Sequence, residues 1–161
     1  VSRSGLVTVT GGKWTTYRAM AEDVLDKCME KALLPLHAKG VTLNLKLLGA
    51  QQTSATAPDL SQGPGLHSYG DEQAAILALP GAHTWLCPGL SEAMVRFAAR
   101  FEYAVKVEDV LARRSRLLFL DALLAAALGP KVGAILQEET GLDPELTPFL
   151  ALAAHYLYLP S

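Results

Sequence analysis

The chain has 161 residues, half of them hydrophobic and 19% charged, with a formal net charge of −2. This length and composition allow one domain of ordinary size with a sizeable core, and they argue against wholesale disorder. The slightly negative charge argues against a general nucleic-acid-binding protein. The most apolar run, residues 117–128, is too short to span a bilayer and contains Asp121.

The first informative segment combines a short apolar alternation with two glycines. Residues 6–10 alternate apolar and threonine side chains and predict a strand. Gly11 and Gly12 predict a turn, and the pattern from Lys13 onward predicts a helix that Pro35 closes. A helix that begins on two glycines leaves its first N–H groups free for an anion or an electron-rich ring edge. Tight packing between strand and helix is the alternative interpretation of the glycine pair.

The rest of the chain changes character twice. Residues 41–48 alternate with period two and predict a possible further strand, and residues 49–70 have the composition of a loop or linker. Residues 71–161 are predicted to form an α-helical domain of about five helices, so the chain belongs to the mostly α class. A strand at residues 6–10 needs sheet neighbours that too little preceding chain can supply. We therefore expect the chain to be the end of a larger protein.

Several helix boundaries in the second half can be predicted. Ser91 is expected to cap a helix whose polar face carries Arg96 and Arg100. The later boundaries are expected at Gly129-Pro130, at Gly141 and at Asp143-Pro144-Glu145.

Arg113, Arg114 and Arg116 form the only concentrated basic group of the chain, and they lie in a predicted helix over residues 108–128. Arg114 falls on the apolar stripe of that helix, as does Asp121. Because an unpaired charge on an apolar face is costly, we expect Arg114 to join a buried or semi-buried ion-pair network, with Asp121, Glu102 or Glu108 as its partner. Arg113 is expected to face outward and to pair with the acid four residues earlier. Contact of these arginines with a second domain or a phosphate is the alternative.

Two blocks carry a resemblance to a known family. Gly11-Gly-Lys-Trp-Thr-Thr-Tyr-Arg18, with Met20-Ala21-Glu22, resembles the last strand–turn–helix of the FAD domain of FAD-dependent (aerobic, quinone-linked) glycerol-3-phosphate dehydrogenases. Residues 95–117 resemble the Glu-x-Ala … Glu-Asp-x-Leu-x-Arg-Arg-Thr-Arg stretch of the same family's C-terminal helical domain, with Ser115 where threonine is usual. The two blocks, in the right order, cover essentially the whole chain.

The resemblance implies a function for the turn. Residues 1–48 would be the C-terminal piece of an FAD-binding domain, in a parent that oxidises sn-glycerol 3-phosphate to dihydroxyacetone phosphate and passes electrons from FAD to quinone. The implied cofactor-binding residues are Gly11, Gly12, Lys13, Trp14 and Thr15, with N–H groups of the last three facing the flavin. Lys13 would also meet the substrate phosphate. A solvated surface lysine is the alternative.

Other expectations concern the chain by itself. It has no Gly-x-Gly-x-x-Gly, so the rest of FAD would bind elsewhere in the parent, and the isolated chain should bind FAD weakly and be inactive. No catalytic base can be named, and the four histidines lack metal-ligand spacing. Expected partners are the parent's FAD and substrate domains, glycerol 3-phosphate and quinone; an oligomer is possible.

The sequence also bears on the cellular compartment and on alternative functions. Two cysteines, not expected to pair, and no apolar signal-peptide region indicate a cytoplasmic protein. Family membership implies a peripheral position on the cytoplasmic face of the inner membrane. The alternatives are an oxygen-using glycerophosphate oxidase and a non-catalytic helical interaction module.

Overall fold

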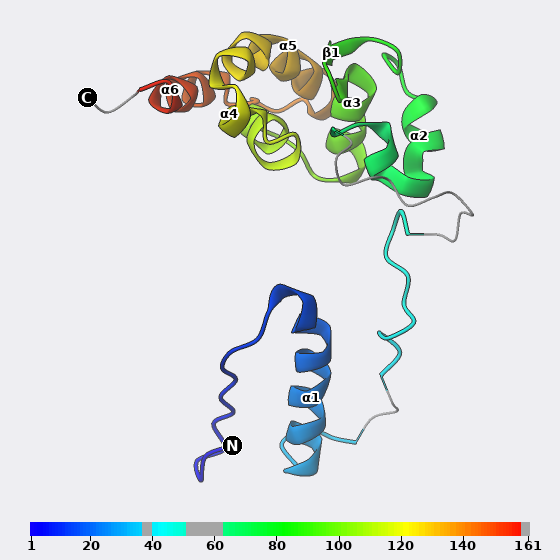
Figure 1. Cartoon of the computed structure of the whole chain (residues 1–161), viewed down its shortest axis with the longest axis vertical. Helices are drawn as coiled ribbons and strands as arrows, with labels where there is room; N and C mark the ends of the chain where they lie inside the picture. Colours follow the sequence, from blue (N-terminus) through cyan, green and yellow to red (C-terminus); the bar gives the residue numbers. More distant parts are fainter. Residues whose placement is uncertain (37–39, 51–62, 159–161) are drawn as a thin grey trace. The chain divides into compact units, whose positions relative to one another are not determined.

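The computed structural model describes residues 1–36, 40–50 and 63–158. The chain divides into two compact units, Val1–Leu47 and Leu48–Ser161, which are described separately (Figure 1). Part of the predicted 49–70 linker, residues 51–62, lies outside the described residues. So does His37, one of the four histidines.

The N-terminal unit is built around one helix. A 3-10 turn, η1 (Trp14–Thr16), leads directly into α1 (Tyr17–Glu30). Residues 6–10 run beside α1 but pair with no strand, so the predicted strand is wrong for this structure (Figure 1). Residues 41–48 form no strand either. The physical reason is the same for both segments: an extended segment becomes a strand only through hydrogen bonds to a neighbour, and the described residues of this unit supply none.

The C-terminal unit is helical with one small hairpin. Its elements are η2 (Leu66–Glu72), α2 (Gln73–Leu77), β1 (Trp85–Cys87), β2 (Leu90–Ser91), α3 (Glu92–Phe101), the π-helical segment η3 (Asp109–Arg114), α4 (Leu117–Leu120), α5 (Ala122–Thr140) and α6 (Leu146–Tyr156). The hairpin is antiparallel, with Trp85 opposite Ser91. This confirms the predicted mostly α class.

The core of this unit lies around α5, which contacts α3, α4 and α6. The fully buried side chains come from all these elements and from the segments between them: Met94, Val95, Val107, Val110, Leu111, Leu118, Val132, Leu136 and Phe149. Burying such aliphatic and aromatic side chains contributes roughly 1.5–3 kcal/mol each before chain entropy is subtracted. The core therefore joins residues that are more than 50 positions apart in the sequence.

Two predicted helix boundaries are confirmed. The Ser91 hydroxyl accepts a hydrogen bond from the Met94 N–H at 3.3 Å and caps α3. Gly141 ends α5 in the left-handed conformation, with φ of 71°. The segment 143–145 does precede α6, but the Asp143 carboxylate accepts from the Glu145 N–H rather than from a helical residue.

The predicted single helix over residues 108–128 is wrong. The chain forms the π-helical segment η3, then breaks at Arg116, whose φ is 57°. It breaks again at Asp121, whose carboxylate accepts from the Leu124 N–H at 2.9 Å and caps α5. Asp121 is thus a helix cap, which explains a charged residue within an apolar run without any ion pair.

The predicted boundary at Gly129-Pro130 is also wrong, because α5 continues through both residues. Pro130 is exposed, and it forgoes one backbone hydrogen bond inside the helix. Gly129 is buried, and a Cβ there would lie 3.2 Å from Leu146 and 3.5 Å from Phe149. The close approach of α6 gives the glycine a packing role in place of a helix-ending one.

Candidate functional site

The predicted site residues lie together at the start of α1. Gly11 and Gly12 have φ of +79° and +102°, a region that side-chain-bearing residues rarely adopt. A Cβ on Gly12 would lie 2.1 Å from the Met20 sulfur, so this glycine permits close packing of the turn against α1. Nothing lies within 4 Å of a Cβ on Gly11. The packing interpretation therefore holds for Gly12, while Gly11 presents bare backbone to open space.

Hydrogen bonds within the turn change the set of available donors. The Lys13 N–H donates to the Thr16 hydroxyl at 3.1 Å, and the Thr16 N–H donates to the Lys13 carbonyl at 2.9 Å. The Lys13 N–H is therefore engaged inside the turn, although it was expected to be a free donor. The N–H groups of Trp14 and Thr15 open the 3-10 turn, where helical geometry offers them no intrahelical partner. They remain the candidate donors.

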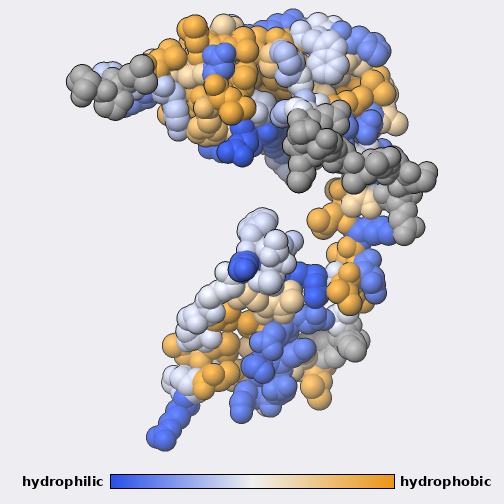
Figure 2. Space-filling model, viewed as in Figure 1, coloured by the Kyte–Doolittle hydropathy of each residue, from blue (hydrophilic) through white to orange (hydrophobic). Residues whose placement is uncertain are grey.

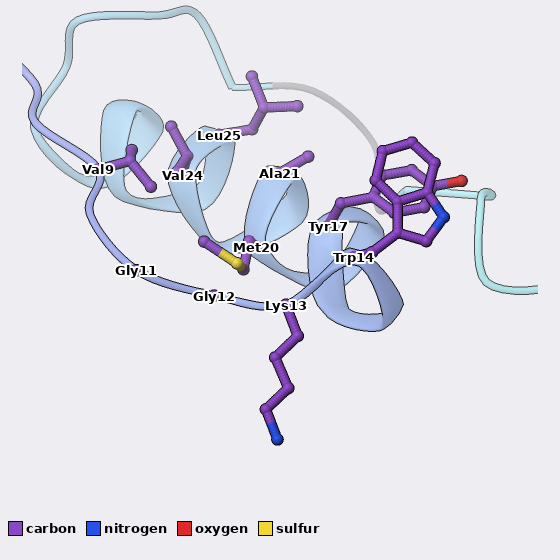
Figure 3. Close-up of a pocket in the computed structure, with 10 residues that line it drawn as sticks. All are labelled: Val9, Gly11, Gly12, Lys13, Trp14, Tyr17, Met20, Ala21, Val24 and Leu25. Carbon is purple, nitrogen blue, oxygen red and sulfur yellow. The ribbon is translucent and has the colours of Figure 1, made fainter. Parts of the chain in front are cut away.

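The turn and α1 line an open hollow of about 620 Å³ (Figure 3). Its lining is mostly apolar and comprises Val9, Gly11, Gly12, Lys13, Trp14, Tyr17, Met20, Ala21, Val24 and Leu25. The Trp14 and Tyr17 rings lie at one end, with centroids 5.3 Å apart. Trp14 is 86% exposed, which is unusual for so large an apolar side chain. The chain thus presents aromatic and aliphatic surface beside the glycine turn.

The Lys13 side chain points away from this hollow (Figure 3). Its backbone belongs to the turn, but its ammonium extends to the opposite side from Trp14 and Tyr17. The backbone of the turn and the ammonium of Lys13 can therefore contact different parts of what is bound at the turn.

The arginine group around Arg114 forms a structural clamp. Arg114 Nε donates to the Glu102 carboxylate at 2.9 Å, and its terminal nitrogens donate to the carbonyls of Asp109, at 2.8 Å, and of Glu102. This confirms Glu102 as the predicted partner and excludes Asp121. Burial is partial: the side chains of Arg114 and Glu102 are 28% and 34% exposed. Arg113 pairs with Asp109 at 2.8 Å, as predicted.

A deeper ion-pair network lies between α3 and α5, and sequence reasoning missed it. Arg96 contacts Glu138 at 2.8 Å and Glu139 at 2.5 Å, and Arg100 also donates to Glu139. The Arg96 and Glu139 side chains are only 11% and 7% exposed. The sequence places Arg96 on the polar face of its helix, and α5 covers that face at Arg96. No local signal could reveal this, because the partners are more than 40 positions apart.

The network shifts the pKa values of its members. Hydrogen bonds from Arg100 and then Arg96 hold the pKa of Glu139 below its usual value despite its burial. The hydrogen bond from Arg96 likewise lowers the pKa of Glu138. The Asp109 pKa is also lowered: burial opposes this, but the N–H groups of Lys106 and Val105 outweigh it. These carboxylates are therefore fully ionised at neutral pH.

The described residues were also compared with the requirements of a metal site and of a membrane-spanning helix, and they meet neither. No group of three or more His, Cys, Asp or Glu side chains there could hold a metal ion. No described helix is both long and apolar enough to cross a membrane. Cys28 is buried and Cys87 is partly buried, and both are free thiols.

Comparison with known proteins assigns the helical region to a family. Residues 40–147 match the model of the C-terminal domain of alpha-glycerophosphate oxidase. The match covers more than half of the chain and includes the clamp around Arg114 and the whole α3–α5 network. The chain therefore belongs to this family.

Curated relatives extend the match toward the turn. Over 82% of this chain it is 35% identical to the probable mitochondrial glycerol-3-phosphate dehydrogenase of Dictyostelium discoideum. Over 86% of the chain it is 37% identical to the mitochondrial glycerol-3-phosphate dehydrogenase SDP6 of Arabidopsis thaliana. Over 89% of the chain it is 32% identical to the mitochondrial glycerol-3-phosphate dehydrogenase of Homo sapiens. The chain spans about a quarter of these relatives: 23%, 27% and 22% of their lengths. No solved structure matches the chain.

Proposed function

We propose that this chain is the C-terminal part of an FAD-dependent glycerol-3-phosphate dehydrogenase that oxidises sn-glycerol 3-phosphate to dihydroxyacetone phosphate. The observation that carries the proposal is the extent of the curated matches. A match over 89% of 161 residues is longer than residues 40–161 alone, so it reaches into the N-terminal unit that holds the glycine turn. Bound FAD would supply the acceptor for the substrate's hydride and a route for the electrons to a quinone.

The turn fits a role beside the flavin of FAD. Gly11 has bare backbone facing open space, so a planar ring can approach it closely. The N–H groups of Trp14 and Thr15 stand at the positive end of the helix that continues into α1. Donors fixed at that end stabilise the negative charge that the reduced flavin carries at N1 and O2. The residues therefore favour the reduced cofactor by electrostatics, without any reorganisation.

Lys13 is the proposed contact for the substrate phosphate. Its ammonium extends from the turn on the side away from the apolar hollow, and a compact cation is suited to a phosphate group (Figure 3). Its backbone is held by the two hydrogen bonds with Thr16, which fix where the side chain begins. Lys13 thus links the geometry of the turn to substrate binding.

The electron acceptor separates two candidate functions. The matching family model is that of an oxidase domain, which favours oxygen, whereas the curated relatives are dehydrogenases. We favour the dehydrogenase and propose that the complete protein is peripheral to the cytoplasmic face of the inner membrane. The isolated chain would then be a non-catalytic helical part that packs with the FAD and substrate domains of its parent.

The proposal is tested in the complete protein that carries this chain. Glycerol 3-phosphate should reduce a soluble quinone analogue far faster than it drives oxygen uptake; the reverse ratio would make the protein an oxidase. Lys13→Ala should lower kcat/KM by about ten- to a hundredfold, because a charge-assisted contact contributes roughly 1.5–3 kcal/mol. Its flavin content, read from the visible spectrum, should stay unchanged. An unaltered kcat/KM would place Lys13 on the solvated surface.

The isolated 161-residue chain provides a second test. Titrated with FAD, it should show no tight binding, because its sequence has no Gly-x-Gly-x-x-Gly to hold the pyrophosphate. A yellow protein that keeps stoichiometric FAD through gel filtration would contradict the proposed division of the cofactor site.

A further inference from the structure

A single hydroxyl group holds both polar backbone groups of Lys13. The Thr16 hydroxyl accepts a hydrogen bond from the Lys13 N–H at 3.1 Å and donates one to the Lys13 carbonyl at 3.0 Å. The Met20 sulfur lies 3.5 Å from the same hydroxyl, but a thioether is a weak acceptor, so the hydroxyl proton goes to the carbonyl. The Thr16 N–H donates to that carbonyl as well, at 2.9 Å. Lys13 is thereby held in an extended conformation, with φ of −121° and ψ of 158°.

The two residues before Lys13 do not fix its backbone in this way. Gly11 and Gly12 both have positive φ, and glycine has more conformational freedom than any other residue. Without a contact on its C-terminal side, Lys13 would follow the movements of this glycine pair. A backbone held in one conformation also fixes the direction of the Cα–Cβ bond, from which the ammonium extends away from the apolar hollow (Figure 3). The Thr16 hydroxyl therefore determines the direction in which the Lys13 side chain leaves the turn.

We propose that Thr16 is a positioning residue for substrate binding, because its hydroxyl orients Lys13 toward the phosphate of glycerol 3-phosphate. The inference rests on the proposed function, in which Lys13 contacts that phosphate. Thr16 acts through Lys13 and needs no contact of its own with the substrate. A cation that is held in place before the substrate arrives loses less freedom on binding, so it binds the phosphate more tightly than a mobile one. Residue 16 must then have a short side chain whose hydroxyl donates and accepts at once, as threonine and serine do.

The alternative role for Thr16 is to stabilise the turn without any effect on the substrate. Lys13 and Thr16 are both exposed, and Figure 2 shows polar to weakly polar surface at the end of the N-terminal unit that carries the turn. Water can therefore replace the hydroxyl at both backbone groups of Lys13, so removal of the hydroxyl should cost little stability. A loss of substrate binding without a matching loss of stability separates positioning from stabilisation.

Steady-state kinetics of variants of the complete protein test the proposal. Thr16→Val should lower kcat/KM for glycerol 3-phosphate about three- to tenfold, less than Lys13→Ala, because the ammonium is still present but no longer fixed. Inhibition by inorganic phosphate, a probe of the same contact, should weaken by a similar factor. Thr16→Ser keeps the hydroxyl and should stay within about twofold of the wild type.

Thr42→Val is the matched control for Thr16→Val. Thr42 belongs to the same unit, and its hydroxyl accepts an exposed hydrogen bond from Arg18 at 3.1 Å. Its replacement removes a comparable contact but none to Lys13, so kcat/KM should not change. The two valine variants should also unfold at the same temperature. A Tm of Thr16→Val well below that of Thr42→Val would assign the hydroxyl to stability and overturn the proposal.

A double variant shows whether Thr16 acts through Lys13. In the Lys13→Ala background the ammonium is gone, so adding Thr16→Val should have no further effect on kcat/KM. An independent structural contribution would lower kcat/KM by the same factor in both backgrounds, and that result would contradict the proposal. A Thr16→Ser variant as impaired as Thr16→Val would contradict it too, since the hydroxyl would then not be the group that matters.

Protection of Lys13 from acetylation separates this inference from the proposed function. In the complete wild-type protein, glycerol 3-phosphate should slow the modification of Lys13 by acetic anhydride, read by peptide mass spectrometry. No protection would refute the phosphate contact itself, and with it the role of Thr16. Protection in the wild type together with an unchanged kcat/KM in Thr16→Val would leave the proposed function intact and refute only the positioning by Thr16.

Discussion

Replacement of Arg96 is the perturbation whose effect the structure defines best. Arg96→Met keeps an apolar stem against the core but leaves Glu139, only 7% exposed, with Arg100 as its remaining charged donor. Removing one partner of a buried ion pair costs roughly 3–5 kcal/mol, and because Arg100 stays, we expect about 3 kcal/mol. For a unit of this size each kcal/mol lowers Tm by roughly 4 °C, so the loss should be about 12 °C.

Thermal unfolding of the chain, followed by circular dichroism at 222 nm, measures this effect. Arg100→Ala is the control, since its side chain is 41% exposed and it contacts the same carboxylate. It should lower Tm by much less. The double variant Arg96→Met/Glu139→Leu should recover most of the lost stability, because replacing both partners of a buried pair by apolar groups is often neutral. Equal Tm values for Arg96→Met and Arg100→Ala would refute the burial argument.

The same network predicts a dependence on pH. The arginines hold the pKa of Glu139 below its value in the unfolded chain, about 4.3. A carboxyl group of this kind stabilises the fold above its unfolded pKa, and the contribution is lost as pH falls through the folded pKa. The gap in stability between the wild-type chain and Arg96→Met should therefore be complete at pH 7 and narrow below about pH 4. A gap that stays constant down to pH 3 would show that packing, not charge, causes it.

Four further substitutions test the local structure through urea midpoints. Arg114→Ala removes the clamp on Glu102 and should lower the free energy of unfolding by roughly 2 kcal/mol. Arg113→Ala should lower it by less than about 1 kcal/mol. Equal urea midpoints for the two variants would contradict the clamp. Asp121→Ala should destabilise by about 1 kcal/mol because it removes the cap of α5. If a continuous helix ran through residue 121, Asp121→Ala would instead stabilise the fold. Pro130→Ala should stabilise by about 1–3 kcal/mol, since it restores a helical hydrogen bond, and a lower midpoint would show that α5 depends on the proline.

The sequence by itself determined what local chemistry controls. Two adjacent glycines before an apolar stripe of period near 3.6 are sufficient to predict the turn and α1, because positive φ and helical periodicity are properties of neighbouring residues. Ser91 and Gly141 were predictable as helix ends for the same reason. The resemblance of two blocks led to the family that residues 40–147 confirm.

Only the tertiary structure decided what depends on residues distant in sequence. The predicted helix over residues 108–128 is broken at Arg116, and Arg114 just before the break is bonded to Glu102, twelve positions away at the end of α3. The tertiary structure also carries α5 through Pro130, where packing against α6 outweighs one lost hydrogen bond. Arg96 shows the limit most clearly. Periodicity places it on a polar face, but whether that face meets solvent or Glu139 depends on a helix 43 positions away, which no local pattern encodes.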